Sequence, residues 1–243
     1  KLQQRIYRAS QRGDVKTYRR LQKTLMNSWS ARVLAVRRVT QDNRGKKTAG
    51  VDGVKSLTPK QRLNLTSQLK LGSKVCPTRR VWIPKLGTEE KRPLGIPTIK
   101  DRALQALTKL ALEPEWEARF EPNSYGFREG RSCHDAIATL FLSLRGKSRY
   151  VLDADIQKCF DRIDHDKLLT KLSTFDTMES QIKAWLKADI MVGYLNRPDE
   201  VFQSMESTPQ DGVISPLLSN IALHGLGDDI KEWYANTWYP ITG

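Results

Sequence analysis

The sequence predicts an α+β fold, for three reasons. Helical periodicity covers residues 2–36 and 59–69 and returns in blocks further along the chain. Two strand-like runs, 80–85 and 91–97, flank a turn at Gly87, and an apolar run ends in acidic residues at 150–156. Helices come first, a hairpin follows, and helices then alternate with strands, which is the order expected of an α+β protein.

The first third of the chain is predicted to be helical. Apolar residues predict a short helix over 2–13, and one long amphipathic helix or two joined ones over 15–36. The polar, glycine-bearing segment 40–50 indicates a mobile basic loop. Thr58-Pro59-Lys60-Gln61 is a capping box with proline at the first helical position, so a helix should follow over 59–69.

A hairpin and two capped helices are expected in the middle of the chain. The prolines within 80–85 and 91–97 favour a short or edge hairpin. Asp101 can cap the helix that follows, which Pro114 should end or kink. Ser132-Cys133-His134-Asp135 should cap the next helix.

The last part of the chain alternates strand and helix. Residues 150–156 are predicted as a strand. Asp164 or His165 should begin a helix that runs to Leu172, and a further helix is expected over 216–226.

Positive charge is concentrated in the first hundred residues. The 243 residues contain 41 Lys and Arg against 27 Asp and Glu, a net charge of +14. Residues 1–50 carry 14 basic against 2 acidic side chains and residues 51–100 carry 11 against 3, which leaves 16 against 22 in the rest. A basic surface that only aids solubility is the alternative, but solubility needs no such segregation. The pattern favours a polyanion partner, with acidic residues that could hold metal ions beside it.

Several protein classes are disfavoured. No uninterrupted apolar stretch approaches 18 residues, so no membrane span is expected. The three cysteines, Cys76, Cys133 and Cys159, are odd in number and widely spaced, which argues against a disulfide framework or a zinc site. A membrane-surface protein would leave an apolar helix face free for lipid, and here that face is needed for packing.

The segment from Asp153 to Phe160 carries the most informative chemistry. An acidic residue at the end of an apolar strand, followed five residues later by an aromatic, is what the palm of a two-metal polymerase requires. Taken alone the pattern is weak, since an Asp at a strand end also caps turns and helices.

Five ordered blocks strengthen this interpretation. Residues 80–85 with 92–97 resemble the fingers hairpin of group II intron reverse transcriptases (maturases), and 124–128 resemble the next block of that family. Residues 155–165 resemble its first catalytic palm block, and 208–220 its template-contacting block. The amino-terminal extension and added loop of the family are matched by 31–40 and 48–53.

The resemblance implies a fragment of the right-hand polymerase fold. A helical amino-terminal extension with its basic loop would occupy 1–50, and the fingers 51–147. Residues 148–243 would form the amino-terminal part of an antiparallel palm sheet.

Roles for single residues also follow from the resemblance. Asp155 would be the catalytic carboxylate and Mg²⁺ ligand, with Ile156 lending its carbonyl to the metal. Lys85 and Arg92 would neutralise the triphosphate of the incoming nucleotide. Phe160 would exclude a ribose 2′-hydroxyl, and Gln210 would lie against the new base pair. Milder alternatives are solvated charges at the hairpin, a core phenylalanine and a turn glutamine.

A further set would contact template or intron RNA. These residues are Arg37, Arg38, Arg44, Lys46, Lys47, Tyr125, Phe127, Arg128, Pro209 and Gly212.

Two departures from the family pattern matter. The family has paired glycines after Pro-Gln, and here Asp211 takes the place of the first. The second catalytic block, an aromatic-Ala-Asp-Asp turn, does not occur in these 243 residues, and Asp228-Asp229 has no hairpin context to replace it. A two-metal Mg²⁺ site would need carboxylates from that block, so this chain alone is expected to be inactive.

The leading functional prediction is an RNA-directed DNA polymerase of a group II intron, which also binds intron RNA to assist splicing and mobility. Its partners would be intron RNA, an RNA template, a DNA primer and deoxynucleoside triphosphates, and no membrane. The alternatives are a non-catalytic RNA-binding splicing cofactor and a related reverse transcriptase recruited to CRISPR adaptation. The expected location is the bacterial cytoplasm, in association with the nucleoid, or an organelle.

Overall fold

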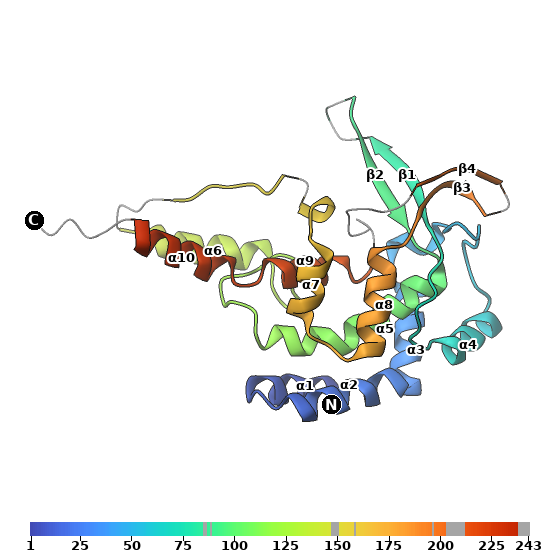
Figure 1. The fold of residues 1–243 in the computed structure, drawn as a ribbon, viewed down its shortest axis with the longest axis horizontal. Coiled ribbons are helices and arrows are strands. Elements are labelled where there is room, and N and C mark those ends of the chain that lie inside the picture. The colour runs from blue at the N-terminus through green and yellow to red at the C-terminus, as the bar shows by residue number, and fades with distance from the viewer. Residues whose placement is uncertain are drawn as a thin grey trace, which may run out of the picture.

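The computed structural model describes residues 1–84, 87, 89–146, 151–157, 159–195, 197–202 and 212–237 (Figure 1). Its α-helices are α1 Leu2–Gln11, α2 Val15–Asn27, α3 Trp29–Arg37, α4 Pro59–Gln68, α5 Ile99–Glu117, α6 Cys133–Leu144, α7 His165–Leu172, α8 Asp176–Leu186, α9 Ser215–Leu223 and α10 Leu226–Thr237. Short helical turns are η1 Arg38–Asp42, η2 Arg44–Lys47 and η3 Cys159–Asp161. The strands are β1 Thr78–Pro84, β2 Lys91–Ile96, β3 Ile190–Tyr194 and β4 Arg197–Phe202. The α+β class is confirmed.

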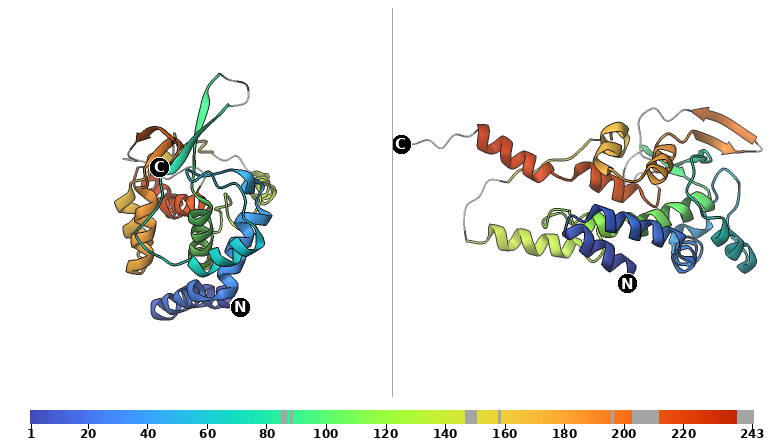
Figure 2. Two further views of the ribbon diagram at one scale, coloured as in Figure 1. Left: turned by 90° about the vertical axis from the view of Figure 1, so that its right-hand side faces the viewer. Right: turned by 60° about the horizontal axis from the view of Figure 1, so that its bottom comes forward.

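Helix α5 lies at the centre of the molecule. The amino-terminal helices pack on one side of it and α7, α8 and α9 lie on another (Figures 1 and 2). Tyr18, Leu21 and Leu25 of α2 are buried, because their spacing of three and four residues places them on one helix face. The predicted long helix is two joined helices, α2 and α3, separated at Ser28.

The sequence predicted that Pro114 would end or kink helix α5, and the helix does not end there but continues to Glu117. A proline inside a helix has no N–H to offer the carbonyl four residues earlier, here that of Leu110. The side-chain amide of Gln3 in α1 donates to this carbonyl at 3.1 Å. Packing of α1 on α5 therefore supplies the hydrogen bond that Pro114 removes.

Three of the helix caps predicted from the sequence are present in the structure. The capping boxes at Thr58 and Ser132 and the cap at Asp164 are confirmed. At α5 the prediction was three residues late, because Thr98 is the cap: its hydroxyl accepts from the N–H of Asp101 at 3.1 Å and donates to that carboxylate at 2.7 Å.

The four strands form one sheet in the order β2-β1-β3-β4. The predicted hairpin is confirmed as the antiparallel pair β1–β2, with Pro93 on the edge strand. Strand β1 also pairs in parallel with β3, through Thr78 with Ile190 and Arg79 with Met191. The strands β3 and β4, like helix α8, were not predicted.

The strand predicted at 150–156 is wrong for its described part. Residues 151–156 have no regular structure, and their side chains are exposed. A β-strand needs a neighbour to take its N–H and C=O groups, and in the described parts of the chain none pairs with this segment. Tyr150 lies outside the described residues.

The segment predicted as a mobile loop, 40–50, instead has short helical turns and a buried anchor. The guanidinium of Arg102 in α5 donates to the carbonyls of Gly45 and Thr48, at 3.2 and 2.7 Å. Gly50 packs so tightly that a Cβ there would lie 2.8 Å from the Cα of Thr98. The loop is thus fastened to α5 at both of these points.

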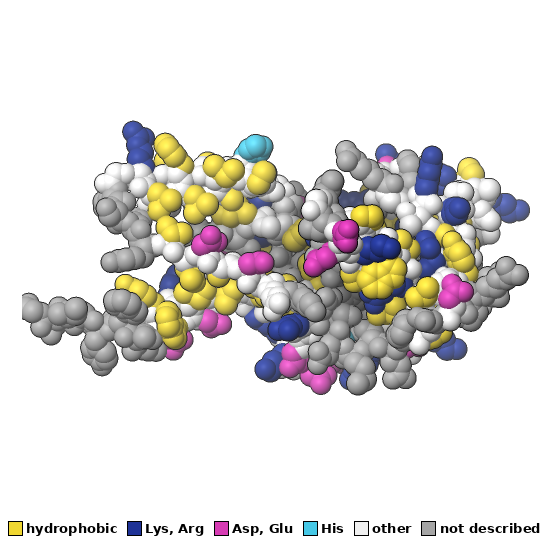
Figure 3. Space-filling model, turned by 90° about the horizontal axis from the view of Figure 1, so that it is seen from above, with side chains coloured by type: hydrophobic (Ala, Val, Ile, Leu, Met, Phe, Trp, Pro, Cys, Tyr) yellow, Lys and Arg dark blue, Asp and Glu magenta, His cyan; other side chains and the backbone are white. Residues whose placement is uncertain are grey.

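At the carboxyl-terminal end the predicted helix over 216–226 is found as α9, followed after a turn at Gly225 by α10. Hydrophobic side chains gather on the surface at the end of the molecule that carries α6 and α10 (Figure 3). On α6 they include Ile137, Phe141 and Leu142, each more than 60% exposed. A patch of this kind marks a contact surface. No helix in the described part of the chain is both long and apolar enough to cross a membrane.

Candidate functional site

The hairpin presents the arginine predicted to bind nucleotide. Arg92 pairs with Ile83 across the β1–β2 ladder, and its side chain is exposed. Lys85, its predicted companion, lies outside the described residues. Trp82 on β1 is 55% exposed, and the guanidinium of Arg80 lies 5.8 Å from the centre of its ring. Cations beside an exposed aromatic ring suit a polyanion that carries bases.

Asp155 and Ile156 line a hollow of about 660 Å³. The hollow lies between the segment 151–157, helix α7 and the end of α9, and both residues are exposed. A carboxylate in this position is accessible to a ligand.

The opposite wall of this hollow comes from α7. The carboxylate of Asp164 accepts from the backbone N–H of Lys167 at 3.0 Å, and this hydrogen bond holds the pKa of Asp164 below its usual value. The ammonium of Lys171 donates to the carbonyls of Ala222 and His224, at the end of α9. Lys171 thus fastens α7 to α9, and Asp155 lines the same hollow.

The residues described in this region do not form the implied two-metal Mg²⁺ site. Within the described parts of the chain no group of three or more His, Cys, Asp and Glu is placed to hold a metal ion. Asp164 already caps α7, which leaves Asp155 as the candidate ligand in the hollow. Two metal ions need more carboxylates than this.

Phe160 lies in the short turn η3, directly after the Asp155 segment. Its side chain is half-buried, so part of the ring is accessible to a ligand. The neighbouring thiol of Cys159 lies 3.7 Å from the hydroxyl of Ser219 in α9. Packing on α9 therefore positions this turn.

The loop between α5 and α6 presents Phe127 and conceals Arg128. Phe127 is 67% exposed and has a φ of +58°, a conformation rare for residues other than glycine. The Arg128 side chain is 2% exposed and donates to both carboxylate oxygens of Glu117, at 2.6 and 3.1 Å. It also donates to the carbonyls of Glu121 and Ser124, at 2.8 and 2.7 Å. Arg128 thus holds the loop from within, and Phe127 faces solvent.

The same loop is tied to its neighbours at two further points. The hydroxyl of Tyr125 is 2.8 Å from that of Thr139 in α6. The side-chain amide of Asn220 in α9 donates to the carbonyl of Gly126 at 2.8 Å. Two blocks that lie almost a hundred residues apart in the sequence therefore meet here.

Within the predicted template-contacting block, 208–220, the structure describes the residues from Gly212 onward, and Gly212 is buried. The next residue, Val213, donates its N–H to the side chain of Gln105 in α5 at 2.9 Å. Pro209, Gln210 and Asp211 lie outside the described residues.

The predicted RNA-binding cations of the amino-terminal region cluster around η1 and η2. Arg37 and Arg38 form exposed ion pairs with Asp42 and Glu129, at 3.5 and 3.6 Å. Pairs of this kind contribute little to stability and exchange readily for phosphate. Lys47 is exposed in η2. The side chains of Arg44 and Lys46 lie outside the described part.

Comparison with known families identifies the family to which the chain belongs. Residues 1–69 match the N-terminal domain of reverse transcriptase, and residues 83–239 match the family described as reverse transcriptase (RNA-dependent DNA polymerase). The chain belongs to the reverse transcriptase family.

Two curated relatives of this reverse transcriptase chain are similar over most of its length. Protein YkfC of Escherichia coli is 36% identical over 208 residues, which is 81% of this chain and 54% of the relative. The group II intron-encoded protein LtrA of Lactococcus lactis is 38% identical over 190 residues, 76% of this chain and 31% of the relative. The chain therefore spans about half of the first relative and a third of the second.

A solved structure is also similar. One chain of a complex titled Partial Cas6-RT-Cas1–Cas2 aligns with 87% of this chain, and 35% of its own length, at 21% identity and a TM-score of 0.48. At that score the likeness bears on neither the fold nor the partners of this reverse transcriptase chain.

Sequence reasoning missed the residues that position the reverse transcriptase loops. Arg102 and Gln105 of α5 hold the segment 45–48 and Val213, and Glu117 holds Arg128. One signal was available: Arg102 and Gln105 lie among alanines and leucines of α5, and a buried polar side chain needs a partner. Which backbone groups they would bind was not readable from the sequence.

Proposed function

We propose that this chain forms the fingers and part of the palm of a group II intron RNA-directed DNA polymerase, which also binds intron RNA to assist splicing and mobility. One observation carries the proposal: a single family match, over 83–239, includes both strand β2 with its exposed Arg92 and the exposed Asp155. The similarity to the intron-encoded protein of Lactococcus lactis supports the intron assignment. The proposed boundaries remain 1–50, 51–147 and 148–243 for extension, fingers and palm.

Asp155 is the proposed catalytic carboxylate, with the Ile156 carbonyl as a second Mg²⁺ ligand. Bound Mg²⁺ would supply charge stabilisation for nucleotidyl transfer. The described residues offer one such carboxylate, so we propose that further ligands are needed and that the 243-residue chain alone does not polymerise. Arg92, Lys85, Phe160 and Gln210 are proposed to bind the incoming nucleotide as predicted from the sequence.

The residues predicted to contact nucleic acid fall into two groups according to how exposed their side chains are. Phe127 and Lys47 are exposed and are proposed to contact template or intron RNA directly. Arg128 is buried against Glu117, and a phosphate could reach it only by replacing that ion pair. We therefore propose Arg128 as a positioning residue for Phe127.

A second candidate function is RNA binding without catalysis. The concentration of positive charge in residues 1–50, with 14 basic against 2 acidic side chains, favours it. In that case the basic surface would serve splicing while DNA synthesis plays no part.

Primer extension with an RNA template, a DNA primer and Mg²⁺ tests the proposal. The 243-residue chain is compared with the complete gene product and its D155N variant. D166N is the matched control, because Asp166 is exposed on the neighbouring helix α7 and does not line the hollow.

We expect DNA synthesis by the complete product and by its D166N variant. We expect none by the D155N variant or by the 243-residue chain. Synthesis that survives in D155N would overturn the assignment of Asp155. RNA binding without synthesis by the complete product would establish the second candidate.

A further inference from the structure

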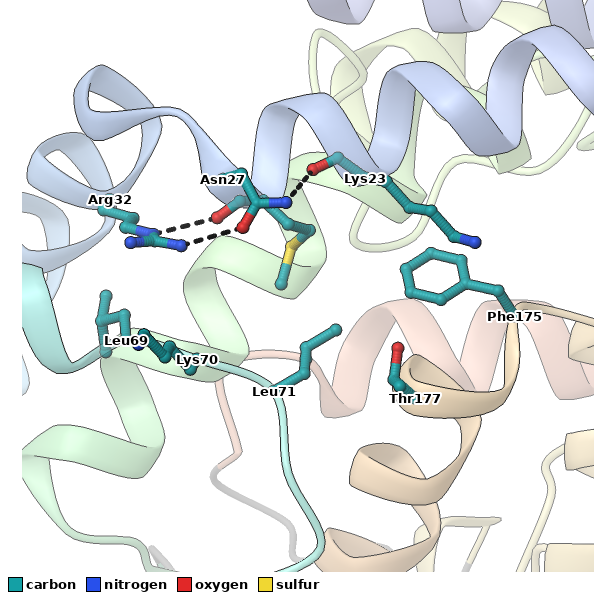
Figure 4. A pocket seen from close by; sticks show the side chains of 9 residues that line it. Lys23, Asn27, Arg32, Leu69, Lys70, Leu71, Phe175 and Thr177 are labelled. Carbon is teal, nitrogen blue, oxygen red and sulfur yellow. Dashed lines mark hydrogen bonds between the residues drawn. The ribbon is translucent and has the colours of Figure 1, made fainter.

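A second hollow, of about 420 Å³, lies where three distant segments meet (Figure 4). The end of α2 and the start of α3 form one side of it. The residues after α4, up to Leu71, form the floor, and the start of α8, with Phe175 and Thr177, forms the other side. This volume falls within the range of about 300–1,000 Å³ typical of small-ligand sites.

Hydrogen bonds fix the upper rim of this hollow before any ligand arrives. Arg32 donates from Nε to the carbonyl of Met26 at 3.0 Å and from its guanidinium to Oδ1 of Asn27 at 3.1 Å. The Asn27 amide donates to the carbonyl of Lys23 at 3.0 Å. The bond to Met26 satisfies a carbonyl left open at the end of α2, and together these bonds hold Arg32 and Asn27 in place (Figure 4).

The lining combines positive charge with an apolar floor. Its charged residues are Lys23, Arg32 and Lys70, and no carboxylate lines it. Leu71 and the ring of Phe175 give it an apolar side, and the ammonium of Lys23 lies 5.0 Å from the centre of that ring. A flat apolar group attached to an anion fits this combination, and a nucleotide has both parts.

The surroundings favour a nucleotide within a nucleic-acid strand over a free one. A larger and more open depression of about 930 Å³ along α2 shares Lys23 and Asn27 with the hollow. Lys16 and Arg20 line it and are exposed. The cations thus continue for more than the length of one nucleotide, as a row of phosphates would require.

We propose that this hollow takes up one unpaired base of a single-stranded RNA, with the flanking phosphates along α2. The base stacks on Phe175 as the Lys23 ammonium moves from the ring to the neighbouring phosphate, and Lys70 binds the phosphate on the other side of the base. The proposal rests on the RNA-binding function proposed above and adds a site that reads the presence of a base.

Binding of a fluorescent single-stranded 12-nucleotide RNA to the complete protein tests this, in parallel with the same RNA made without bases. F175L replaces the ring but keeps an apolar side chain at the edge of the core, and a melting curve checks its folding. K70Q tests the phosphate contact, and K183Q is its matched control on α8, since Lys183 is exposed and does not line the hollow.

F175L should weaken binding of the normal RNA about tenfold and leave binding of the base-free RNA unchanged. K70Q should weaken both and lower the salt dependence, whereas K183Q should change neither. Equal effects of F175L on both RNAs, or none, would overturn the base site. If adenosine monophosphate binds as tightly as the RNA, the hollow binds a free nucleotide, and the proposal that it binds a nucleic-acid strand is wrong. If neither RNA binds the unaltered protein at all, the proposed RNA-binding function itself has failed.

Discussion

Arg128 binds both carboxylate oxygens of Glu117, although one residue belongs to a loop and the other ends the helix before it. This pair closes the loop on itself. Phe127, the residue before Arg128, has a left-handed backbone conformation and an exposed side chain. Strained residues held outward by a buried anchor are common at binding sites.

Replacing Arg128 by Ala should lower the free energy of unfolding by about 3 kcal/mol, because Glu117 then loses its partner and two loop carbonyls lose their donor. Urea unfolding measures this. The control R145A, at an exposed position after α6, should change stability by no more than about 0.5 kcal/mol. Equal losses in both variants would refute the anchoring role.

Arg92 should matter for the nucleotide and not for folding, since its side chain is exposed near the end of the hairpin. R92A in the complete enzyme should raise KM for deoxynucleotides about tenfold, with little change in melting temperature. Lys91 is a matched control, because neighbours on a strand point to opposite faces. A KM raised equally by K91A would indicate a general effect of charge.

Phe160 should control sugar selection in the complete enzyme. If its accessible ring edge lies under the nucleotide, a 2′-hydroxyl overlaps it at a cost of about 1–3 kcal/mol. F160V should then raise relative ribonucleotide incorporation about tenfold to a hundredfold. Incorporation of both sugars is measured together with a melting curve. An unchanged sugar preference with a large loss of stability would identify Phe160 as a core residue.

The contribution of the amino-terminal region to RNA affinity is best tested by single substitutions. Deleting 1–50 would remove buried residues such as Ile6 and Leu21 and expose the core around α5. K47Q should instead weaken RNA binding and reduce the slope of log K against log salt by about 0.7. Titration at several salt concentrations measures the slope. K60Q, at an exposed position of α4, is the control and should leave the slope unaltered.

Folding stability should increase as the pH falls from neutral toward the ordinary pKa of glutamate. Burial raises the pKa of Glu113 in the folded protein, although Lys109 lies 3.2 Å away. At neutral pH the folded state bears the cost of a buried charge, and it takes up a proton before the unfolded state does as the pH falls. Burial raises the pKa of Asp101 and Glu115 in the same direction.

The variant E113Q isolates this effect. Its stability relative to the unaltered chain should be greatest at pH 7 and decline as the pH approaches the ordinary value of 4.5. Urea unfolding at pH 7 and pH 5 gives the comparison. A difference that does not vary with pH would show that Glu113 is not the titrating group.

Features that depend on near neighbours in the chain were predictable. The capping boxes at Thr58 and Ser132 use a side chain and an N–H three residues apart, so both partners are visible in the sequence. The hairpin β1–β2 likewise joins adjacent segments. Asp155 and Arg92 were predicted as site residues in the same way, from blocks of contiguous residues typical of the family.

Contacts between distant segments were decided by the tertiary structure alone. Whether 151–156 forms a strand depends on a ladder partner elsewhere, and in the described part of the chain none pairs with it. That α5 passes through Pro114 depends on Gln3, more than a hundred residues earlier, which binds the carbonyl that the proline leaves open. The outward position of Phe127 and the hollow beside Phe175 arise similarly, because a buried polar group must find its partner wherever packing places one. The sequence carries the chemistry of such groups, and only folding brings the partners within hydrogen-bonding distance.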